Sequence, residues 1–116
     1  MKNSEKIKKE LSRTLISKHK SWLWSYNIAD ENVLLSDHII IEKYLLWGNR
    51  YDWAKIKQVF NSSLIKNIWI NNLIPSGMYE EKQRRIAKYF FNINQPSKYL
   101  KTARKKHLNN ALAGIN

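Results

Sequence analysis

Only a few side chains in this sequence are of types that could perform catalysis or bind a metal ion. His38 and Glu42 stand four residues apart, a spacing that can bind a metal on one side of a helix, but two side chains do not make a site. Asp37 and Asp52 are further acids that folding could bring into one cleft, as a small nuclease would need. Each has a simpler use at the start or rim of a helix. We therefore predict no enzymatic activity, no metal site and no cofactor, with a small nuclease as an alternative.

The motifs of the common enzyme and cofactor classes are absent from the sequence. There is no cysteine, which excludes disulfides, thiolate zinc sites and cysteine nucleophiles. There is no glycine-rich phosphate loop and no Gly-x-Ser-x-Gly elbow. The first residues, MKNSEKIKKEL, contain no apolar signal-peptide core, and no apolar run is long enough for a membrane span. We expect a cytoplasmic protein with no membrane partner.

The net charge of +12 is concentrated at the two ends of the 116-residue chain. Residues 1–20 contain seven Lys/Arg and two Glu, residues 21–97 contain nine Lys/Arg and seven Asp/Glu, and residues 98–116 contain five Lys/Arg and no acid. The middle is therefore nearly balanced, whereas each end has a net charge of +5. Such ends suit the phosphate backbone of RNA or DNA, or an acidic protein surface. The alternative is a pair of solvated cationic ends without a ligand.

Both basic ends are predicted to be helical. Apolar residues at positions 7, 11 and 15 recur at helical spacing, which predicts a helix over residues 4–19 with Ser4 as its N-cap. A second basic helix is predicted over residues 98–112. Its cations have no acid within reach along the sequence, and unpaired like charges one turn apart repel each other. A polyanion would stabilise this helix, through salt-dependent and largely sequence-independent phosphate contacts. The candidate nucleic-acid-binding residues are Lys6, Lys9, Arg13, Lys20, Lys98, Lys101, Arg104, Lys105 and Lys106.

The stretch EEKQRRIAKYFF, residues 80–91, is also rich in charged and aromatic side chains. Glu80 precedes Arg84 by four residues, and Glu81 precedes Arg85 by four, which is the arrangement of a solvated helix face that pairs its own charges. We therefore predict that this helix, over residues 79–91, is mainly structural.

Trp22 and Trp24 are candidate base-stacking residues. They lie in residues 22–26, whose alternating pattern predicts an irregular or extended segment. Aromatic side chains beside basic residues can stack on the bases of a single strand. Burial in the core is the alternative that we favour, because Trp is commonly largely buried.

The segment 36–48 has the clearest helix signals in the chain. Ser36 is a good N-cap, Gly48 suits the position after the helix end, and the residues between them are apolar nearly all round. Such a helix is expected to be buried, so residues 37–47 are predicted to be the central helix. The whole chain, residues 1–116, is predicted to be an all-α, compact single-domain bundle of five to six short helices, with its core in residues 21–93.

Two further helices are predicted between the central helix and residue 75. The first is expected to be capped by Asp52, and the second by Ser62 or Ser63. Together residues 53–74 have the outline of a DNA-binding helix-turn-helix. The second helix, however, has no Arg for guanine, and its polar side chains are Lys66, Asn67, Asn71 and Asn72.

The core positions of residues 21–93 follow a pattern that we compare with known families. The pattern comprises Trp24-Ser25-Tyr26, Asp37, Ile39, Ile40, Leu45, Gly48, Asp52, Ile56, Phe60, Ile65 and Trp69. It resembles a family of small bacterial helical proteins that are common in Bacteroidetes-type genomes and are often encoded beside nucleotidyltransferase-like toxins. The resemblance implies a helical fold and an antitoxin-like role, and it leaves both basic helices outside.

These observations predict a non-enzymatic, regulatory binding protein. Its partner would be RNA, in preference to DNA, or a ribonucleoprotein, contacted through the basic terminal helices. The high Lys, Asn and Ile content suggests an AT-rich bacterial or phage genome. The first alternative is therefore a phage-type inhibitor of a bacterial defence nuclease, anti-CRISPR-like, which binds protein or guide RNA. A toxin or defence nuclease is the expected protein partner, and the oligomeric state is left open.

Overall fold

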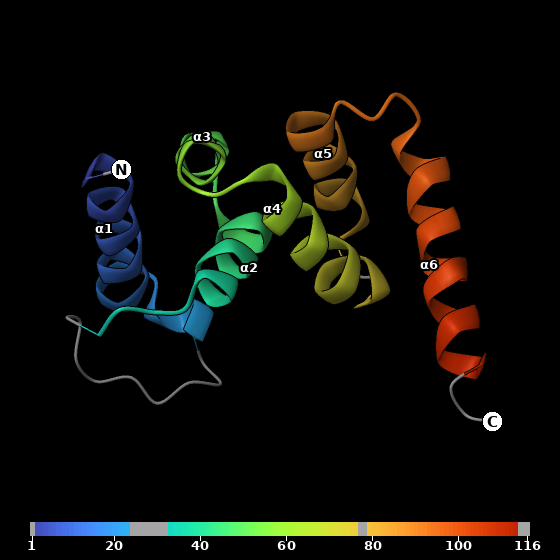
Figure 1. Cartoon of the computed structure of the whole chain (residues 1–116), viewed down its shortest axis with the longest axis horizontal. Helices are drawn as coiled ribbons and strands as arrows, with labels where there is room; N and C mark the ends of the chain where they lie inside the picture. The colour runs from blue at the N-terminus through green and yellow to red at the C-terminus, as the bar shows by residue number, and fades with distance from the viewer. Residues whose placement is uncertain (1, 24–32, 77–78, 114–116) are drawn as a thin grey trace. The chain divides into compact units, whose positions relative to one another are not determined.

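A computed structural model of the chain describes residues 2–23, 33–76 and 79–113 (Figure 1). Within these ranges the chain forms helices and their connections and has no β-strand, which confirms the all-α prediction. Contacts within the chain divide it into two compact units, residues 1–61 and 62–116. Each unit has its own buried side chains, and the single domain expected over residues 1–116 stays a prediction.

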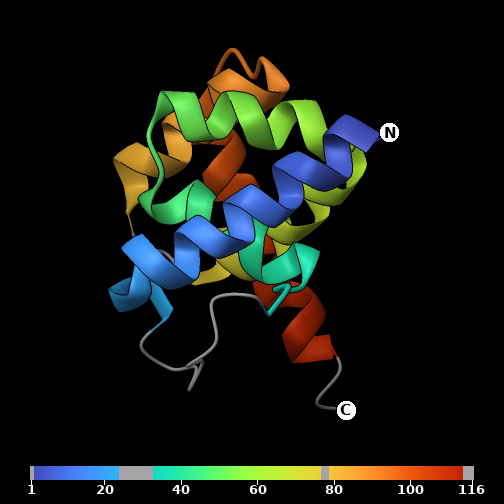
Figure 2. The same cartoon turned by 90° about the vertical axis from the view of Figure 1, so that its left-hand side faces the viewer.

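The first unit contains three α-helices and one turn of 3-10 helix. These are α1 (Lys2–Lys18), η1 (Lys20–Leu23), α2 (Asp37–Trp47) and α3 (Arg50–Val59). Helix α1 contacts both α2 and α3, and Figure 2 views this unit from the side of α1. Apolar side chains from all three helices form the core, among them Leu11, Leu15, Ile16, Ile40, Ile41, Leu45, Trp53 and Ile56.

Helix α2 was expected to be buried on nearly its whole circumference, and it is buried on most of it. Ile40 and Ile41 have no exposed surface, while Ile39 and Leu46 are half-buried. Trp47, at the last position, is 41% exposed. The helix end lies near the surface, so the apolar run reaches one residue beyond the part of the helix that the core covers.

The structure confirms one predicted cap and corrects two others. Ser36 is the N-cap of α2, where its side chain accepts a hydrogen bond from the Ile39 N–H at 3.3 Å. Ser4 lies inside α1 and is not its cap, because the helix already begins at Lys2. Asp52 does not cap α3 either: Asn49 is the N-cap, and Asp52 returns a hydrogen bond to the Asn49 N–H at 3.0 Å. Asn is as good a cap as Asp, and the pair forms a capping box.

Gly48 ends α2 for a reason that the sequence does not show. Its φ is −74°, so it does not use the left-handed conformation expected of a glycine after a helix. Its N–H donates to the Tyr44 carbonyl at 2.8 Å. A Cβ atom at this position would lie 2.5 Å from the same carbonyl oxygen, so close approach of the backbone requires glycine here.

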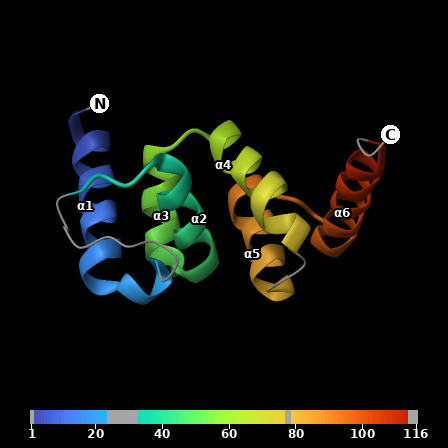
Figure 3. The same ribbon diagram turned by 90° about the horizontal axis from the view of Figure 1, so that it is seen from below.

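The second unit contains three α-helices and two short helical turns. They are α4 (Ser62–Ile68), the π-helical turn η2 (Trp69–Leu73), the 3-10 turn η3 (Ile74–Ser76), α5 (Glu80–Phe91) and α6 (Pro96–Ala113). Helix α6 contacts α5 and η3, and Figure 3 shows α4, α5 and α6 from below. The buried side chains include Ile65, Ile68, Trp69, Leu73, Ile74, Ile86, Phe90 and Leu100.

Candidate nucleic-acid interface

Helix α1 presents a row of exposed cations on the side away from the core. Leu11 and Leu15 on the buried side are 3% and 0% exposed. Lys6, Lys9 and Arg13 lie on the opposite side and are exposed, as predicted from the helical period, and Lys20 in η1 is exposed as well. None of these four cations forms an ion pair with an acidic side chain in the described part of the chain.

Three hydrogen bonds that the sequence did not indicate fix α1 on its unit. The hydroxyl of Ser12, which is buried, donates to the Val33 carbonyl at 3.1 Å and accepts from the Leu35 N–H at 2.9 Å. The hydroxyl of Tyr44 donates to the Leu11 carbonyl at 2.9 Å. These bonds satisfy polar groups inside the core, so they hold the basic face of α1 towards solvent.

Helix α6 presents a second group of exposed cations. Lys98, Lys101, Lys105 and Lys106 are exposed, and Leu100 on the opposite side is 0% exposed. No ion pair joins any of these lysines to an acid among residues 2–23, 33–76 and 79–113. Their positive charges therefore remain available to an anion, and they repel one another along the helix.

Arg104 differs from the lysines of α6, although the sequence grouped it with them. Its side chain is half-buried, its Nε donates to the Ile74 carbonyl at 3.2 Å, and its Nη2 pairs with the Glu80 carboxylate. Glu80 stands 24 residues earlier in the chain, so only the packing of α6 in its unit could reveal this partner. Arg104 attaches α6 to its neighbours and contributes little free charge to the exposed face.

The charges of α5 pair within the helix, as its sequence predicted. Arg85 lies 2.7 Å from Glu81, and Arg84 lies 3.9 Å from Glu80, each pair one helical turn apart. The same residue types thus occur in two arrangements in this chain. They are paired on α5 and without acidic partners on the outer faces of α1 and α6.

Of the two candidate stacking residues, Trp22 is packed and Trp24 lies outside the described residues. The Trp22 ring stacks on His19, with 3.8 Å between the ring centroids and 5° between the planes. Its edge contacts Tyr44, with 5.9 Å between the centroids. One face of Trp22 is therefore covered by the chain itself. Residues 22 and 23 form part of a 3-10 turn, whereas the sequence predicted an irregular or extended segment.

The acids considered for a nuclease each have a neighbour within the chain. Asp37 lies 3.8 Å from Lys8, Glu42 lies 3.9 Å from Lys43, and Asp52 belongs to the capping box of α3. His38 is exposed. Among the described residues, no three His, Asp or Glu side chains come close enough together to hold a metal ion.

The two helices of the predicted helix-turn-helix belong to different units. Helix α3 ends the first unit, and α4 begins the second directly after Asn61. The polar residues of the second helix, Lys66, Asn67, Asn71 and Asn72, are all exposed. Asn71 donates to Asn67 one turn earlier, so these two amides already bond to each other.

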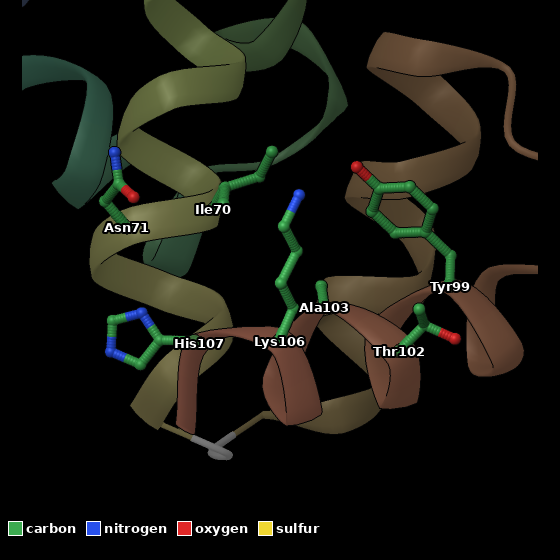
Figure 4. A pocket seen from close by; sticks show the side chains of 7 residues that line it. All are labelled: Ile70, Asn71, Tyr99, Thr102, Ala103, Lys106 and His107. Atoms are coloured by element: carbon green, nitrogen blue, oxygen red, sulfur yellow. The ribbon is translucent and has the colours of Figure 1, made fainter. Parts of the chain in front are cut away.

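A cavity in the second unit is a feature that the sequence did not reveal. It has a volume of about 440 Å³ and is lined by residues of η2 and α6: Ile70, Asn71, Tyr99, Thr102, Ala103, Lys106 and His107 (Figure 4). These residues are brought together from two segments about 30 positions apart, and neither segment carries a motif. From the sequence, the helical period of each segment could predict the faces of that helix, but it could not predict which faces of the two helices lie against each other.

Comparison with known proteins adds no family or function. No family model matches the sequence, and no curated protein or solved structure is similar to it. The resemblance to small helical proteins encoded beside toxins therefore stays a prediction. In the described part of the chain, every helix is too short or too polar to cross a membrane.

Proposed function

We propose that this protein is a non-enzymatic, regulatory binding protein that contacts nucleic acid through the outer faces of α1 and α6. The observation that supports this most is the contrast between two sets of basic side chains. Arg84 and Arg85 pair with acids of their own helix, whereas the exposed lysines of α6 have no acidic partner in the described residues. A helix with unpaired like charges is less stable alone than against an anion.

Phosphate contacts explain why such a surface needs no motif. Lysines that neutralise phosphates release bound counterions, and this supplies strong binding with little dependence on sequence. RNA is the favoured partner, because the exposed residues of α4 and η2 include no Arg to read guanine in a DNA major groove. An antitoxin-like role is what the resemblance of the core pattern implies.

The test compares two double variants that remove the same charge. Lys101→Ala with Lys105→Ala removes two unpaired cations, and Arg84→Ala with Arg85→Ala removes two that have acidic partners. For binding to single-stranded RNA, the dependence of log affinity on log salt should become less steep by about 1.4 in the lysine variant. The arginine variant should keep a slope close to that of the unchanged protein. Both are measured by fluorescence anisotropy with the full chain over a salt series.

Two outcomes would contradict the proposal. The first is absence of binding to single-stranded RNA, duplex RNA and duplex DNA of mixed sequence at low salt. The second is an equal loss of slope in both double variants, which would indicate that total charge matters and the unpaired faces do not.

A second candidate is an inhibitor that binds a toxin or defence nuclease directly. Tyr51 is 82% exposed and Trp47 is 41% exposed, and Arg50 stands between them in the sequence. Trp, Tyr and Arg are the residue types that dominate protein–protein binding energy. A partner captured from a nuclease-treated lysate, and lost with Tyr51→Ala, would favour this function. Loss of every captured protein after nuclease treatment would exclude it.

A further inference from the structure

The second unit contains a series of stacked side chains that ends at the cavity of Figure 4. The Lys66 ammonium lies 5.9 Å from the centre of the Phe91 ring. The Phe91 ring stacks on Trp69 at 5.1 Å, and Tyr99 stacks on Trp69 at 5.6 Å with 7° between the planes. Trp69 is completely buried, while Tyr99 is half-buried and lines the cavity. Phe91 is half-buried as well, but Tyr99 is the ring of this series that lines the cavity, so it is the one that a ligand bound there can contact.

The cavity beside Tyr99 combines an aromatic wall with hydrogen-bonding groups and positive charge. Asn71 and Thr102 can donate and accept hydrogen bonds, and Lys106 extends from α6 between Ile70 and Tyr99 in Figure 4. No acidic side chain lines it. Its volume of about 440 Å³ falls in the range of roughly 300–1,000 Å³ that is typical of small-ligand sites.

Two features of the surroundings favour a nucleotide as the occupant. The exposed lysines Lys98, Lys101 and Lys105 lie on another face of the same helix as Lys106, within about two turns of it, so they add positive charge near the cavity without lining it. One wall of the cavity comes from η2, a π-helical turn, and such turns inside helices occur frequently at functional sites.

We propose that this cavity takes one nucleotide of a single strand, with its base against Tyr99 and its phosphate near Lys106. The inference rests on the proposed function and adds to it a place for a base. Stacking needs an unpaired base, so a duplex would contact only the lysines of α6. Asn71 and Thr102 bring hydrogen-bonding groups to the cavity lining, although the Asn71 amide nitrogen also donates to Asn67, and the cation of Lys106 supplies the charge that a phosphate requires.

The experiment separates base binding from phosphate binding by changing the probe. One strand carries normal bases, and a second strand of equal length carries the same phosphates on base-free sugars. Each is prepared as RNA and as DNA, and binding to the full chain is measured by fluorescence anisotropy. We expect the normal strand to bind roughly 5- to 100-fold more tightly than the base-free strand, because one stacked base contributes that much.

Matched variants test whether the base binds in the cavity. Ala103→Leu fills the cavity without changing charge, and Ala54→Leu adds the same side chain at an exposed position of α3. The difference in affinity between normal and base-free strands should disappear in Ala103→Leu and persist in Ala54→Leu. Thermal unfolding checks that both variants fold. If Ala103→Leu does not fold, Thr102→Leu, at an exposed lining position, takes its place.

The outcomes distinguish this inference from the proposed function. Equal, salt-dependent binding of normal and base-free strands overturns the cavity as a base site and leaves the phosphate-binding faces intact. A preference for normal strands that survives in the filled-cavity variant also overturns it, because the base then binds elsewhere. Absence of binding to every strand overturns both proposals. If the preference for normal over base-free strands is found with RNA only, the cavity takes a nucleotide of RNA. If it is found with RNA and DNA alike, the cavity takes a nucleotide of either.

Discussion

Lysine and arginine side chains in this protein serve two purposes, according to what lies beside them. The Lys8 ammonium lies 3.8 Å from Asp37 and 5.0 Å from the centre of the Phe60 ring, so it helps to hold α1 in its unit. Arg104 bonds to Glu80 and to the Ile74 carbonyl and holds α6. Lys9 and Lys101, on the same two helices, are exposed and have no acidic partner among the described residues. A count of positive charges alone overestimates the free binding surface.

A buried tyrosine gives the first unit a defined response to alkaline pH. Burial raises the pKa of Tyr44, and the negative charge of Asp52 raises it further. The folded protein therefore keeps this phenol protonated above pH 10, where the unfolded chain releases the proton. The unfolded state then binds fewer protons than the folded state, so stability is intact below about pH 10 and falls above it.

Tyr44→Phe tests this dependence. At neutral pH the variant should lose about 0.5–1.5 kcal/mol, because the hydrogen bond to the Leu11 carbonyl is removed. Above about pH 10 the free energy of unfolding of the unchanged protein should fall by up to ~1.4 kcal/mol per pH unit more steeply than that of the variant. Urea unfolding from neutral to alkaline pH measures both curves. Parallel curves over the whole range would show that Tyr44 does not titrate on unfolding.

At the scale of elements, α2 carries the core of the first unit. Its serine N-cap and its glycine end fix where the helix begins and stops, and its buried face includes Ile40. Ile40→Ala should lower the free energy of unfolding by about 2–5 kcal/mol, because it leaves a cavity in a packed core. His38→Ala, at an exposed position of the same helix, should change it by less than about 0.5 kcal/mol. Equal effects in urea unfolding would mean that Ile40 is not buried.

Helix α6 is attached at Arg104 and presents its lysines from there. Arg104→Ala should lower the free energy of unfolding by about 1–2 kcal/mol, since a partly exposed, charged hydrogen-bond pair is lost. Lys105→Ala, one residue later and exposed, should leave stability within about 0.5 kcal/mol and weaken RNA binding more than Arg104→Ala does. Thermal unfolding and anisotropy measure the two effects. If Arg104→Ala lowers the salt slope as much as Lys105→Ala, Arg104 contacts phosphate and its assignment to structure is wrong.

At the scale of the whole molecule, charge is separated along the chain. The ends hold a net charge of +10 of the total +12. If a polyanion contacts both ends, cations at both ends should contribute to the salt dependence of its binding affinity. Combining Lys6→Ala and Lys9→Ala with Lys101→Ala and Lys105→Ala should therefore make the slope less steep by about 2.8 for a single strand. The α1 pair alone should account for about half of this change. A slope that the α1 pair leaves unaltered would restrict the interface to α6.

The sequence by itself determined the helical class, the main helices and the basic character of the ends. Helical spacing of apolar residues identified α1, α5 and α6, because an amphipathic helix must bury one face whatever it packs against. Helix α2 was identified instead by its serine cap, its glycine end and its apolar character nearly all round. The acid–base pairs of α5 could also be predicted from the sequence, since partners one turn apart meet in any helix. The same local reasoning placed Lys6, Lys9, Lys101 and Lys105 on exposed faces.

Only the tertiary structure decided which polar groups meet across the chain. Arg104 and Glu80 are 24 residues apart, and Ser12 reaches a carbonyl 21 residues away, so no local period could pair them. The cavity beside Tyr99 likewise depends on which face of α6 packs near η2. Such contacts depend on the packing of helices against one another, which is set by side-chain shape over a whole interface and not by spacing within one helix.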